Sequence, residues 1–395
     1  MTSNNQNQDL VKKDVTNLVT EIFIKAIERR ASDIHLEPED SSFNVRFRVD
    51  GLLYLVDKLS IDLKDPLISR IKVMSQLDIT EHRLPQDGHI EFKNQDTVHN
   101  MRISTFPTLR GEAVVVRILD RKDIVMKIVD LGLNSNQLSI IQKLIATPFG
   151  IIVITGPTGS GKTSFLYSII NTLGTSDKNI VTIEDPVEFN IPGIRQSQVK
   201  ESIGLDFAKA MRSVARQDPN VVMLGEIRDS DTAHMAFQAS LSGALVLTTF
   251  HTFDVPGVVV RLLEMGIPRS VLAHAIKGVI SMRLLRKICS ECKTPRSFTP
   301  DENGNIQFGD SDTTSVAKCS LCHNVGYYGR TGIFEIVPFD NETKFRILEG
   351  ISTSEMLTFF ENKKFGSLWQ SATDKINQGI TTAEEVMRVI GPEPI

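Results

Sequence analysis

The sequence predicts an α/β protein in which an α+β N-terminal domain precedes a mostly parallel sheet with helices on both faces. Three observations support this prediction. An apolar run at 151–155 enters a glycine-rich turn and then an apolar helical pattern. Apolar strand patterns alternate with helix patterns from there to residue 249. Earlier, apolar and polar residues alternate with a period of two over 43–49, which is typical of a half-buried strand.

Length and composition limit the class of protein. A chain of 395 residues is expected to form two or three domains, and an apolar content of 41% is sufficient for their cores. The formal net charge of −4 disfavours bulk binding of nucleic acid. The polar N-terminus lacks a signal-peptide core, and no apolar run approaches the roughly 20 residues of a membrane span. We therefore expect a cytosolic protein that meets a membrane only through a partner.

The first 120 residues indicate a compact α+β domain behind a polar tail. We expect disorder over 1–16, a domain over 17–120 and an amphipathic helix near 15–30. The dipeptide Asp50-Gly51 is a hairpin-turn signal. A second turn is expected at 85–88 and a helix at 66–77, and strands are expected at 34–37, 43–49, 52–56, 89–92, 98–106 and 112–119.

The remainder of the chain divides into four predicted parts. A linker with a helix leads to a nucleotide-binding core, a cysteine-containing segment follows it, and strand and helix patterns end the chain. The predicted bounds of these parts are 121–149, 150–285, 286–330 and 331–395.

The segment 151–163, IIVITGPTGSGKT, predicts a strand, a phosphate loop and a helix in succession. A chance glycine-rich turn would lack this flanking strand and helix. Its glycines let backbone N–H groups face phosphate oxygens, Lys162 supplies positive charge, and Thr163 supplies a hydroxyl for Mg²⁺. We therefore expect ATP and Mg²⁺ to bind at Gly156, Pro157, Thr158, Gly159, Ser160, Gly161, Lys162, Thr163 and Ser164.

Two further strand patterns end in acids. In VTIEDPVE, Glu184, Asp185 and Glu188 cluster at a strand end and could hold Mg²⁺ through its waters, although an exposed acidic turn is the alternative. In VVMLGE, a buried strand ends in a carboxylate, so Glu226 is the candidate base that orients the attacking water. Gly225 stands where many phosphate-loop enzymes carry an Mg²⁺-linked Asp, so the acid cluster is expected to supply that function.

One histidine and four arginines complete the candidate catalytic set. His251 ends the strand pattern LTTFHT and either senses the γ-phosphate or is an ordinary structural histidine. Arg212 and Arg216 are spaced to share one helix face, while Arg102 and Arg117 lie on predicted strands of the first domain. An arginine from a neighbouring subunit can offset the charge that develops in phosphoryl transfer, whereas a surface salt bridge is the alternative for any single arginine.

The four cysteines form two C-x-x-C pairs separated by 26 residues, and in a reducing cytosol this pattern favours a metal over a disulfide. Each pair can supply two corners of a tetrahedral Zn²⁺ site. Four unrelated buried thiols are the alternative, and His323 is a competing ligand. The predicted zinc ligands are Cys289, Cys292, Cys319 and Cys322.

Eight segments between about residues 17 and 370 carry a family resemblance, and they occur in one order: ASDIHLEP, RFRVDG, SRIKVMSQLDITEHRLPQDG, RISTFPTLRGEAVVVRIL, GPTGSGKT, TIEDPVE, RQDPNVVMLGEIRD and LTTFHT. Together they resemble the secretion ATPases of type II secretion and type IV pilus assembly. The resemblance implies a PAS-like N-terminal domain joined flexibly to a RecA-like ATPase domain with an inserted zinc module. It further implies a homohexamer, peripheral to the inner membrane, that hydrolyses ATP and turns a membrane platform protein, so that pilin subunits are added or removed.

The resemblance also assigns residues. It implies that Lys162 and Thr163 bind phosphate and Mg²⁺, that Glu226 is the catalytic acid, and that Glu184 and His251 belong to the Asp and His boxes. Tetracysteine modules occur in assembly and secretion types and are usually lacking in retraction types. Four arginines match those that line the nucleotide in related enzymes: Arg102, Arg117, Arg212 and Arg216.

Three residues differ from the family pattern, and these differences affect the sensing of the γ-phosphate rather than the binding of ATP. Ala244 and Phe253 replace a His and an Asn that flank the His box, and His89 replaces an Arg. The resemblance begins near the start of the sequence, so we expect the extra N-terminal recruitment domain of many assembly ATPases to be absent.

Two other functions are consistent with a phosphate-loop protein. A nucleic-acid motor of conjugation or DNA uptake is one, although the acidic balance and the lack of a basic or aromatic groove disfavour direct DNA contact. A nucleotide-regulated structural ring with little turnover is the other.

Overall fold

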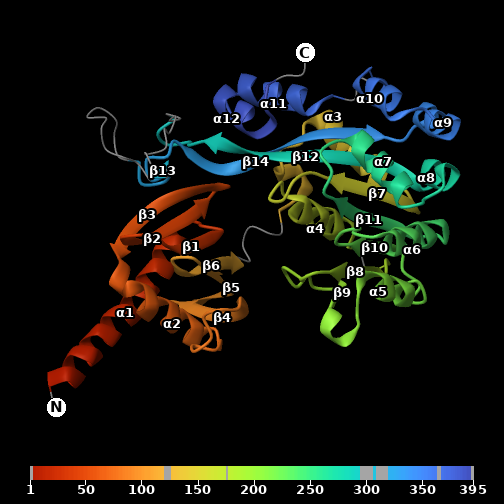
Figure 1. The fold of residues 1–395 in the computed structure, drawn as a ribbon. Coiled ribbons are helices and arrows are strands. Elements are labelled where there is room, and N and C mark those ends of the chain that lie inside the picture. Colours follow the sequence, from red (N-terminus) through yellow and green to blue (C-terminus); the bar gives the residue numbers. More distant parts are fainter. Residues whose placement is uncertain are drawn as a thin grey trace. The chain divides into compact units, whose positions relative to one another are not determined.

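The computed structural model describes residues 3–119, 126–174, 177–293, 306–307, 319–362 and 366–392. The chain forms two compact units, shown as ribbons in Figure 1. Unit 1 comprises Met1–Arg121 and Ile288–Gly329, and unit 2 comprises Lys122–Lys287 and Arg330–Ile395. The cysteine-containing segment thus groups with the N-terminal unit rather than with the unit that carries the phosphate loop.

Unit 1 is built on a sheet whose strand order is β13-β3-β2-β1-β6-β5-β4. The period of two predicted over 43–49 is confirmed for its apolar residues, because Phe43, Val45, Phe47 and Val49 are all buried, whereas Asn44 departs from the alternation and is buried as well. Their face of the sheet packs against helices α1 and α2 in one apolar core. The elements are α1 Ser3–Glu28, β1 Asp33–Pro38, β2 Ser42–Val49, β3 Leu52–Ser60, η1 Ile61–Leu63, α2 Lys64–Met74, β4 Gln86–Asn94, β5 Thr97–Thr108, β6 Gly111–Leu119 and β13 Ile306–Gln307.

Two glycine-containing turns predicted for unit 1 have different outcomes. Asp50 and Gly51 both have positive φ and connect β2 to β3, as the hairpin signal predicts. The turn predicted at 85–88 is wrong, since β4 already begins at Gln86. Gly88 serves close packing instead: a Cβ there would lie 2.9 Å from the Ser75 carbonyl oxygen at the end of α2.

Helix α1 begins at Ser3, well before Val15, where the sequence pattern predicted its start. The apolar positions from Val15 to Ala26 bury one face of the helix, as predicted. The residues before Val15 include several Gln and Lys, which have good helix propensity, so they extend the packed helix toward the N-terminus.

Unit 2 is built on a sheet of order β14-β12-β7-β11-β10-β8-β9, in which the pairs from β12 to β9 are parallel. Helices cover both faces, as predicted from the alternation of elements. The strands and short helices are η2 Ile128–Asp130, β7 Gly150–Thr155, β8 Ile180–Glu184, β9 Arg195–Gln198, η3 Glu201–Ile203, β10 Val221–Leu224, β11 Leu245–Phe250, β12 Ile276–Ile288 and β14 Tyr327–Pro338.

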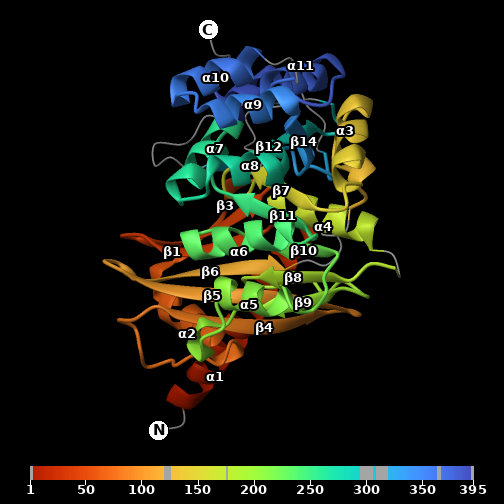
Figure 2. The same ribbon diagram turned by 90° about the vertical axis from the view of Figure 1, so that its right-hand side faces the viewer.

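Alternate residues of the central strands pack into two separate apolar cores, one on each face of the sheet. Ile152 and Ile154 of β7 face the core that contains α3 and α4, which lie together at the right of this unit in Figure 2. Ile151 and Val153 face the core that contains α5 to α10. The α-helices of unit 2 are α3 Ser135–Ile145, α4 Lys162–Leu173, α5 Phe207–Val214, α6 Ser230–Leu241, α7 Val255–Glu264, α8 Arg269–Ala275, α9 Asn341–Glu349, α10 Thr353–Asn362, α11 Leu368–Asn377 and α12 Ala383–Ile390.

Helices α11 and α12 close a smaller cluster around Leu285 of β12 and Ile333 of β14. Among the residues that the structure describes, every helix is too short or too polar to cross a bilayer.

Candidate functional site

The carboxyl ends of four parallel strands in unit 2 meet at one edge of the sheet. Thr155 of β7 pairs with Phe250 of β11, and Leu224 of β10 pairs with both Thr248 of β11 and Ile183 of β8. The segments that follow these strands carry the phosphate loop, the acids after β8, Glu226 and His251. Parallel topology therefore gathers residues that are widely spaced in sequence, at the edge where α/β sheets bind ligands.

The phosphate loop encloses the ammonium group of Lys162. Its Nζ donates to the carbonyl oxygens of Gly156, at 2.7 Å, and Pro157, at 3.0 Å. Burial lowers the pKa of Lys162 to about 8; nearby Arg283 also lowers it, and Glu226 opposes the change. An added anion in this site would favour the charged form of the lysine and raise its pKa again.

The rest of the loop fits a phosphate group. Gly156 has φ 151°, and a Cβ there would lie 2.6 Å from the carbonyl oxygen of Met282, so only glycine fits. Gly161, also with positive φ, precedes α4 and offers no side-chain cap to that helix. Among the described residues, the Ser160 hydroxyl is buried and meets no hydrogen-bonding partner. An orphan hydroxyl and uncapped N–H groups at a helix start are donors suited to phosphate oxygens.

Glu226 and His251 lie next to Lys162. His251 Nε2 is 3.0 Å from Glu226 Oε2, and His251 Nδ1 is 3.5 Å from Lys162 Nζ. A neutral imidazole with its proton on Nε2 satisfies both contacts, because it donates to the carboxylate and accepts from the ammonium. The structure thus brings together three residues that the sequence analysis had placed in separate motifs.

Arg228, which the sequence analysis did not identify as a site residue, donates to the other oxygen of Glu226. Its Nε and Nη2 lie 2.8 Å and 2.5 Å from Glu226 Oε1, and its Nη1 lies 3.4 Å from Asp185 Oδ2. A signal was present, since Arg228 follows the β10 strand end by only a few residues. The guanidinium links the acid after β8 to the acid after β10.

Glu184 faces the protein interior instead of joining its neighbours in an acid cluster. It is 2% exposed, and its carboxylate accepts hydrogen bonds from the Tyr167 hydroxyl, the Thr182 hydroxyl and Gln196 Nε2. Asp185, whose side chain is 38% exposed, is the acid of this segment that reaches Arg228. Of these two adjacent acids, Asp185 is therefore the one whose carboxylate is accessible at the site.

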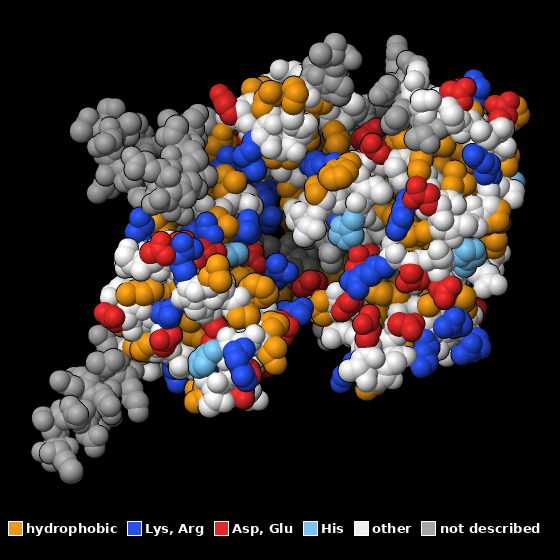
Figure 3. Space-filling view, viewed as in Figure 1, with side chains coloured by type: hydrophobic (Ala, Val, Ile, Leu, Met, Phe, Trp, Pro, Cys, Tyr) orange, Lys and Arg blue, Asp and Glu red, His pale blue; other side chains and the backbone are white. Residues whose placement is uncertain are grey.

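Arg212 and Arg216 do not share a helix face as predicted. Only Arg212 lies in α5, which ends at Val214, and Arg216 donates from Nη1 to the Arg212 carbonyl at 2.8 Å. Asp218 has positive φ and precedes Pro219, a combination that opposes continuation of the helix. Both arginines are exposed, and Figure 3 shows Lys and Arg side chains gathered over α5.

Arg102 and Arg117 lie side by side in unit 1, on the face of the sheet opposite its core. They are register partners on β5 and β6, and Arg117 in turn pairs with Asp33 of β1. Arg117 Nε lies 2.9 Å from Asp33 Oδ1, whereas Arg102 Nη2 is 3.9 Å from Asp87 Oδ1. His89, the substitution noted in the sequence, is the register partner of Arg102 on β4.

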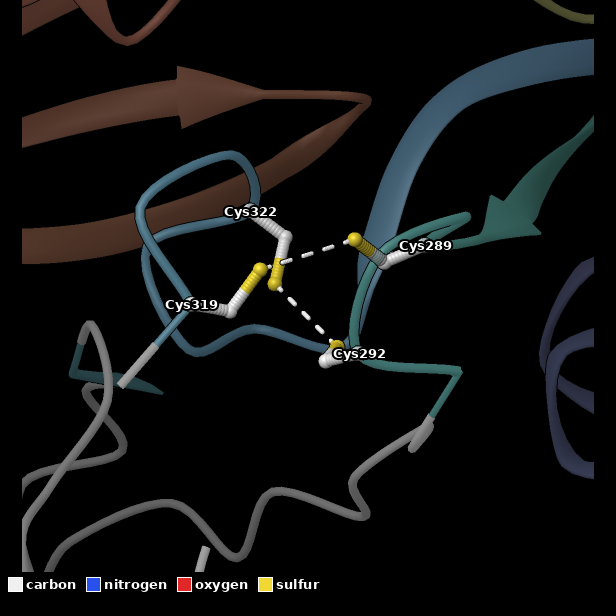
Figure 4. A group of neighbouring side chains, drawn as sticks. All are labelled: Cys289, Cys292, Cys319 and Cys322. Carbon is white, nitrogen blue, oxygen red and sulfur yellow. Dashed lines mark hydrogen bonds between the residues drawn. The ribbon is translucent and has the colours of Figure 1, made fainter. Parts of the chain in front are cut away.

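The four cysteines converge on one point, as Figure 4 shows. Their sulfur atoms all lie within 4.8 Å of one another, with Cys289 and Cys319 at 3.7 Å and Cys292 and Cys322 also at 3.7 Å. A tetrahedral Zn²⁺ with bonds of about 2.3 Å needs sulfurs roughly 3.8 Å apart. The geometry therefore fits zinc.

Cys322 is a thiol whose environment favours the neutral form, and a bound cation would reverse this preference. Burial raises its pKa to about 12, while the N–H of Gly326 donates to its Sγ at 3.3 Å and opposes that rise. Bound zinc would favour the thiolate over the neutral thiol. Among the described residues, the clustered ligand atoms are the four sulfurs, without His323.

The segment that carries the second cysteine pair is packed into unit 1. Val325 and Tyr327 are both 5% exposed and belong to the same apolar core as the N-terminal strands. The guanidinium of Arg30 lies 3.6 Å from the ring centre of Tyr328, and the N–H of Gly329 donates to Asp50 Oδ2 at 2.9 Å. The cysteine cluster is thus continuous with the fold of the N-terminal unit.

A family model described as type II/IV secretion system protein matches residues 8–388. The chain is 42% identical over 387 residues to the type IV pilus assembly ATPase PilB of Myxococcus xanthus, covering 96% of this chain and 68% of that protein. It is 39% identical over 391 residues to the type II secretion system ATPase E of Vibrio cholerae, covering 97% and 78%.

Two solved structures share the fold. The Legionella pneumophila ATPase DotB has a TM-score of 0.68 at 24% identity and covers 93% of this chain and 94% of its own. The pilus retraction motor PilT with bound ADP has a TM-score of 0.62 at 24% identity and covers 95% and 97%.

Proposed function

The chain belongs to the type II/IV secretion system protein family, and we propose that it is the hexameric ATPase that moves an inner-membrane platform protein and so powers type II secretion or assembly of a type IV pilus or pseudopilus. Its activity as a secretion or pilus ATPase follows from the family. The hexamer, the platform partner and peripheral association with the inner membrane from the cytoplasm are the finer parts of the proposal. In the same proposal, unit 1 is PAS-like and unit 2 is RecA-like.

One observation carries the proposal: the ammonium of Lys162, the imidazole of His251 and the carboxylate of Glu226 are in contact at the end of the central strands. A phosphate-binding cation, a γ-phosphate sensor and a base must lie this close together to act on one phosphoryl group. Neither a simple nucleotide-binding module nor a structural ring requires a carboxylate at this position.

In this proposal each residue of the site has a separate role in ATP hydrolysis. The Lys162 ammonium and the N–H groups of the phosphate loop hold the β- and γ-phosphates. Glu226 orients the attacking water and accepts its proton. His251 donates a hydrogen bond from Nε2 to the carboxylate of Glu226. Mg²⁺, held by Thr163 and Asp185, would neutralise phosphate charge when bound.

Arg228 orients the catalytic carboxylate. Its Nε and Nη2 both donate to Glu226 Oε1, so this oxygen is held in place in the nucleotide-free chain. The phosphate oxygens offer the guanidinium an alternative partner.

Four further arginines are proposed to complete the site in the hexamer. Arg102, Arg117, Arg212 and Arg216 have positive charge that can offset the developing charge on the equatorial oxygens. In this proposal the cysteines bind one Zn²⁺ ion per chain, which stabilises their segment of the fold.

Steady-state ATP hydrolysis by the purified full-length chain tests the proposal. We expect turnover that requires Mg²⁺, is lost in Lys162→Ala and rises when the cytoplasmic part of the platform protein is added. Single-stranded and double-stranded DNA form the comparison arm. Stimulation by DNA and not by the platform protein would favour a nucleic-acid motor, and turnover that neither ligand changes would favour a regulated ring.

A further inference from the structure

We propose that Tyr167 is a positioning residue for ATP hydrolysis, which fixes the acidic segment 185–191 relative to the helix that begins at the phosphate loop. The inference rests on the ATPase activity stated above and goes beyond it. It holds that a buried hydroxyl determines the positions of Asp185 and Arg228. It also gives Glu184 a different task from the one expected of an acid at a strand end.

Tyr167 connects α4 to the segment after β8 by two bonds of one oxygen atom. It is fully buried and lies one helical turn after Thr163. Its hydroxyl donates to Glu184 Oε2 and accepts the N–H of Glu188 at 3.3 Å. Burial, reinforced by the bond to Glu184, raises the pKa of the Tyr167 hydroxyl well above its usual range, so it remains a donor. One hydroxyl thus bonds to the last residue of β8 and to the middle of the segment 185–191 that follows it.

Glu184 is fully occupied by partners within the protein. Besides Tyr167, the Thr182 hydroxyl and Gln196 Nε2 donate to it, the latter at 3.1 Å. Gln196 also donates to the Phe189 carbonyl at 2.9 Å and accepts the N–H of Ile191 at 2.6 Å. A buried carboxylate with this many donors is an organising centre for the backbone around it. Glu184 therefore acts through the segment it holds rather than on a phosphate.

Asp185 transmits the position of this segment to the catalytic carboxylate. It is the next residue after Glu184, so its place follows from the bonds that Tyr167 makes. Its Oδ2 lies 3.4 Å from Arg228 Nη1, and the same guanidinium bonds to Glu226. These contacts begin on α4 at Tyr167 and end at Glu226, which His251 connects back to the first residue of α4. A shift of the segment would therefore displace Arg228 and, with it, Glu226.

A simpler role for Tyr167 is to fill the core, and the chain offers a matched control for it. Tyr167→Phe keeps the ring and removes only the hydroxyl. Ser168→Ala removes a hydroxyl that is equally buried on the same helix, but that donates to the carbonyls of Met126 and Ser164 and not to Glu184. A purely structural role predicts similar effects of the two substitutions on activity.

Kinetics of the full-length chain separate these alternatives. We expect Tyr167→Phe to lower kcat about tenfold, while KM for ATP stays within about twofold of wild type, because positioning is lost and the phosphate loop is intact. The Mg²⁺ concentration for half-maximal rate should rise. Ser168→Ala should match wild type in all three quantities. Equal kcat and Mg²⁺ dependence in the two variants would overturn the inference.

Hydrogen exchange in the nucleotide-free chain gives a readout that does not depend on turnover. We expect faster exchange of the Glu188 amide and its neighbours in Tyr167→Phe, with exchange over 156–163 unchanged. Unchanged exchange over 185–191 would also overturn the inference. If wild type hydrolysed no ATP, the activity assignment would fail instead, and the exchange result would still decide for or against Tyr167.

Discussion

Glu226 and His251 face each other across 3.0 Å, with the imidazole Nε2 directed at the carboxylate Oε2. The other oxygen of the carboxylate is held by Arg228. Glu226 is therefore fixed in place from two sides before nucleotide binds, which lowers the entropic cost of orienting a water molecule. Neither partner lies in the strand that delivers Glu226, so its geometry depends on β11 and on the segment after β10.

Glu226→Gln should retain ATP binding and lose hydrolysis. The amide has the size of the carboxylate and still bonds to neighbours, but it cannot accept a proton from water. We expect kcat to fall at least about a hundredfold, with ATP affinity within a few-fold of wild type. Equilibrium binding and single-turnover hydrolysis measure the two quantities separately. Wild-type turnover in this variant would remove Glu226 from the role of base.

The affinity for ATP should decrease above pH 8 because of Lys162. Its pKa in the empty site is lowered to about 8, chiefly by burial, and a bound triphosphate favours the protonated form. Binding near pH 8 should therefore take up about half a proton per ATP, and affinity should fall by up to roughly tenfold per pH unit above that value. Calorimetry at pH 8 in two buffers of different ionisation enthalpy measures the uptake.

Lys162→Ala is the control for this pH dependence. It should bind ATP weakly, since the ammonium is lost, and should show no proton uptake between pH 7 and 9. The same uptake in wild type and variant would assign the titration to another group.

The sequence predicted which strands end at the site, but it did not predict which acids point into it. Glu184 and Asp185 are adjacent and equally polar, so pattern alone assigns them the same function. Their different directions result from Tyr167 and Gln196, which are 17 and 12 residues from Glu184 in sequence and belong to other elements. Tyr167 itself follows the apolar pattern of a buried helix face, which hides the function of its hydroxyl.

The sequence pattern likewise could not predict that the cysteine segment belongs to the same unit as the N-terminal strands. Spacing predicts that two C-x-x-C pairs can meet, and the four sulfurs do converge. The bonds that attach the segment to the N-terminal unit involve Arg30 and Asp50, which lie more than 270 residues earlier in the chain than Gly329. No local pattern specifies such a contact.

Removal of metal should destabilise unit 1 as well as the cysteine segment. We expect metal analysis to find about one Zn²⁺ per chain, and Cys319→Ser to release it. Because Val325 and Tyr327 belong to the unit 1 core, loss of the metal should increase proteolysis and hydrogen exchange in the strands β1 to β3. ATP binding to unit 2 serves as the internal control. A metal-free preparation with an unchanged melting temperature would contradict the prediction.

Glu335 should make the stability of unit 2 depend on pH. Burial raises the pKa of this carboxyl on β14 to about 7; Asp254 reinforces the rise, and Arg283 opposes it. The folded-state value lies above the unfolded value of 4.5, so the stabilisation present below pH 4.5 is lost as pH rises toward 7. Glu335→Gln should remove this loss and stabilise the unit at pH 8 by on the order of 3 kcal/mol.

Thermal unfolding of wild type and Glu335→Gln at pH 5 and pH 8 measures this effect. Glu349→Gln is the matched control, because Glu349 is an exposed carboxylate on the following helix α9. The melting temperatures of wild type and Glu335→Gln should differ more at pH 8 than at pH 5. An equal difference at both values would show that Glu335 does not titrate in this range.

Arg117 should act on ATP hydrolysis through the assembled ring. The carboxylate of Asp33, which is buried, holds its Nε at 2.9 Å, so its direction is fixed. We expect Arg117→Ala to lower kcat by roughly 10³ in the best case, with little change in ATP affinity, and wild-type turnover to rise with protein concentration as hexamers form. Arg110→Ala is the control, since Arg110 is an exposed arginine in the turn between β5 and β6 that pairs with Asp40.

Mixing two inactive variants then tests whether Arg117 serves a neighbouring subunit. A subunit carrying Arg117→Ala has an intact Glu226, and a subunit carrying Glu226→Gln has an intact Arg117. If the arginine acts across a subunit junction, random mixing should restore complete sites at about a quarter of positions, and activity should reappear. If it acts within its own chain, the mixture should stay as inactive as its parts. Full activity of both Arg102→Ala and Arg117→Ala, with turnover per chain independent of concentration, would refute a role for these arginines.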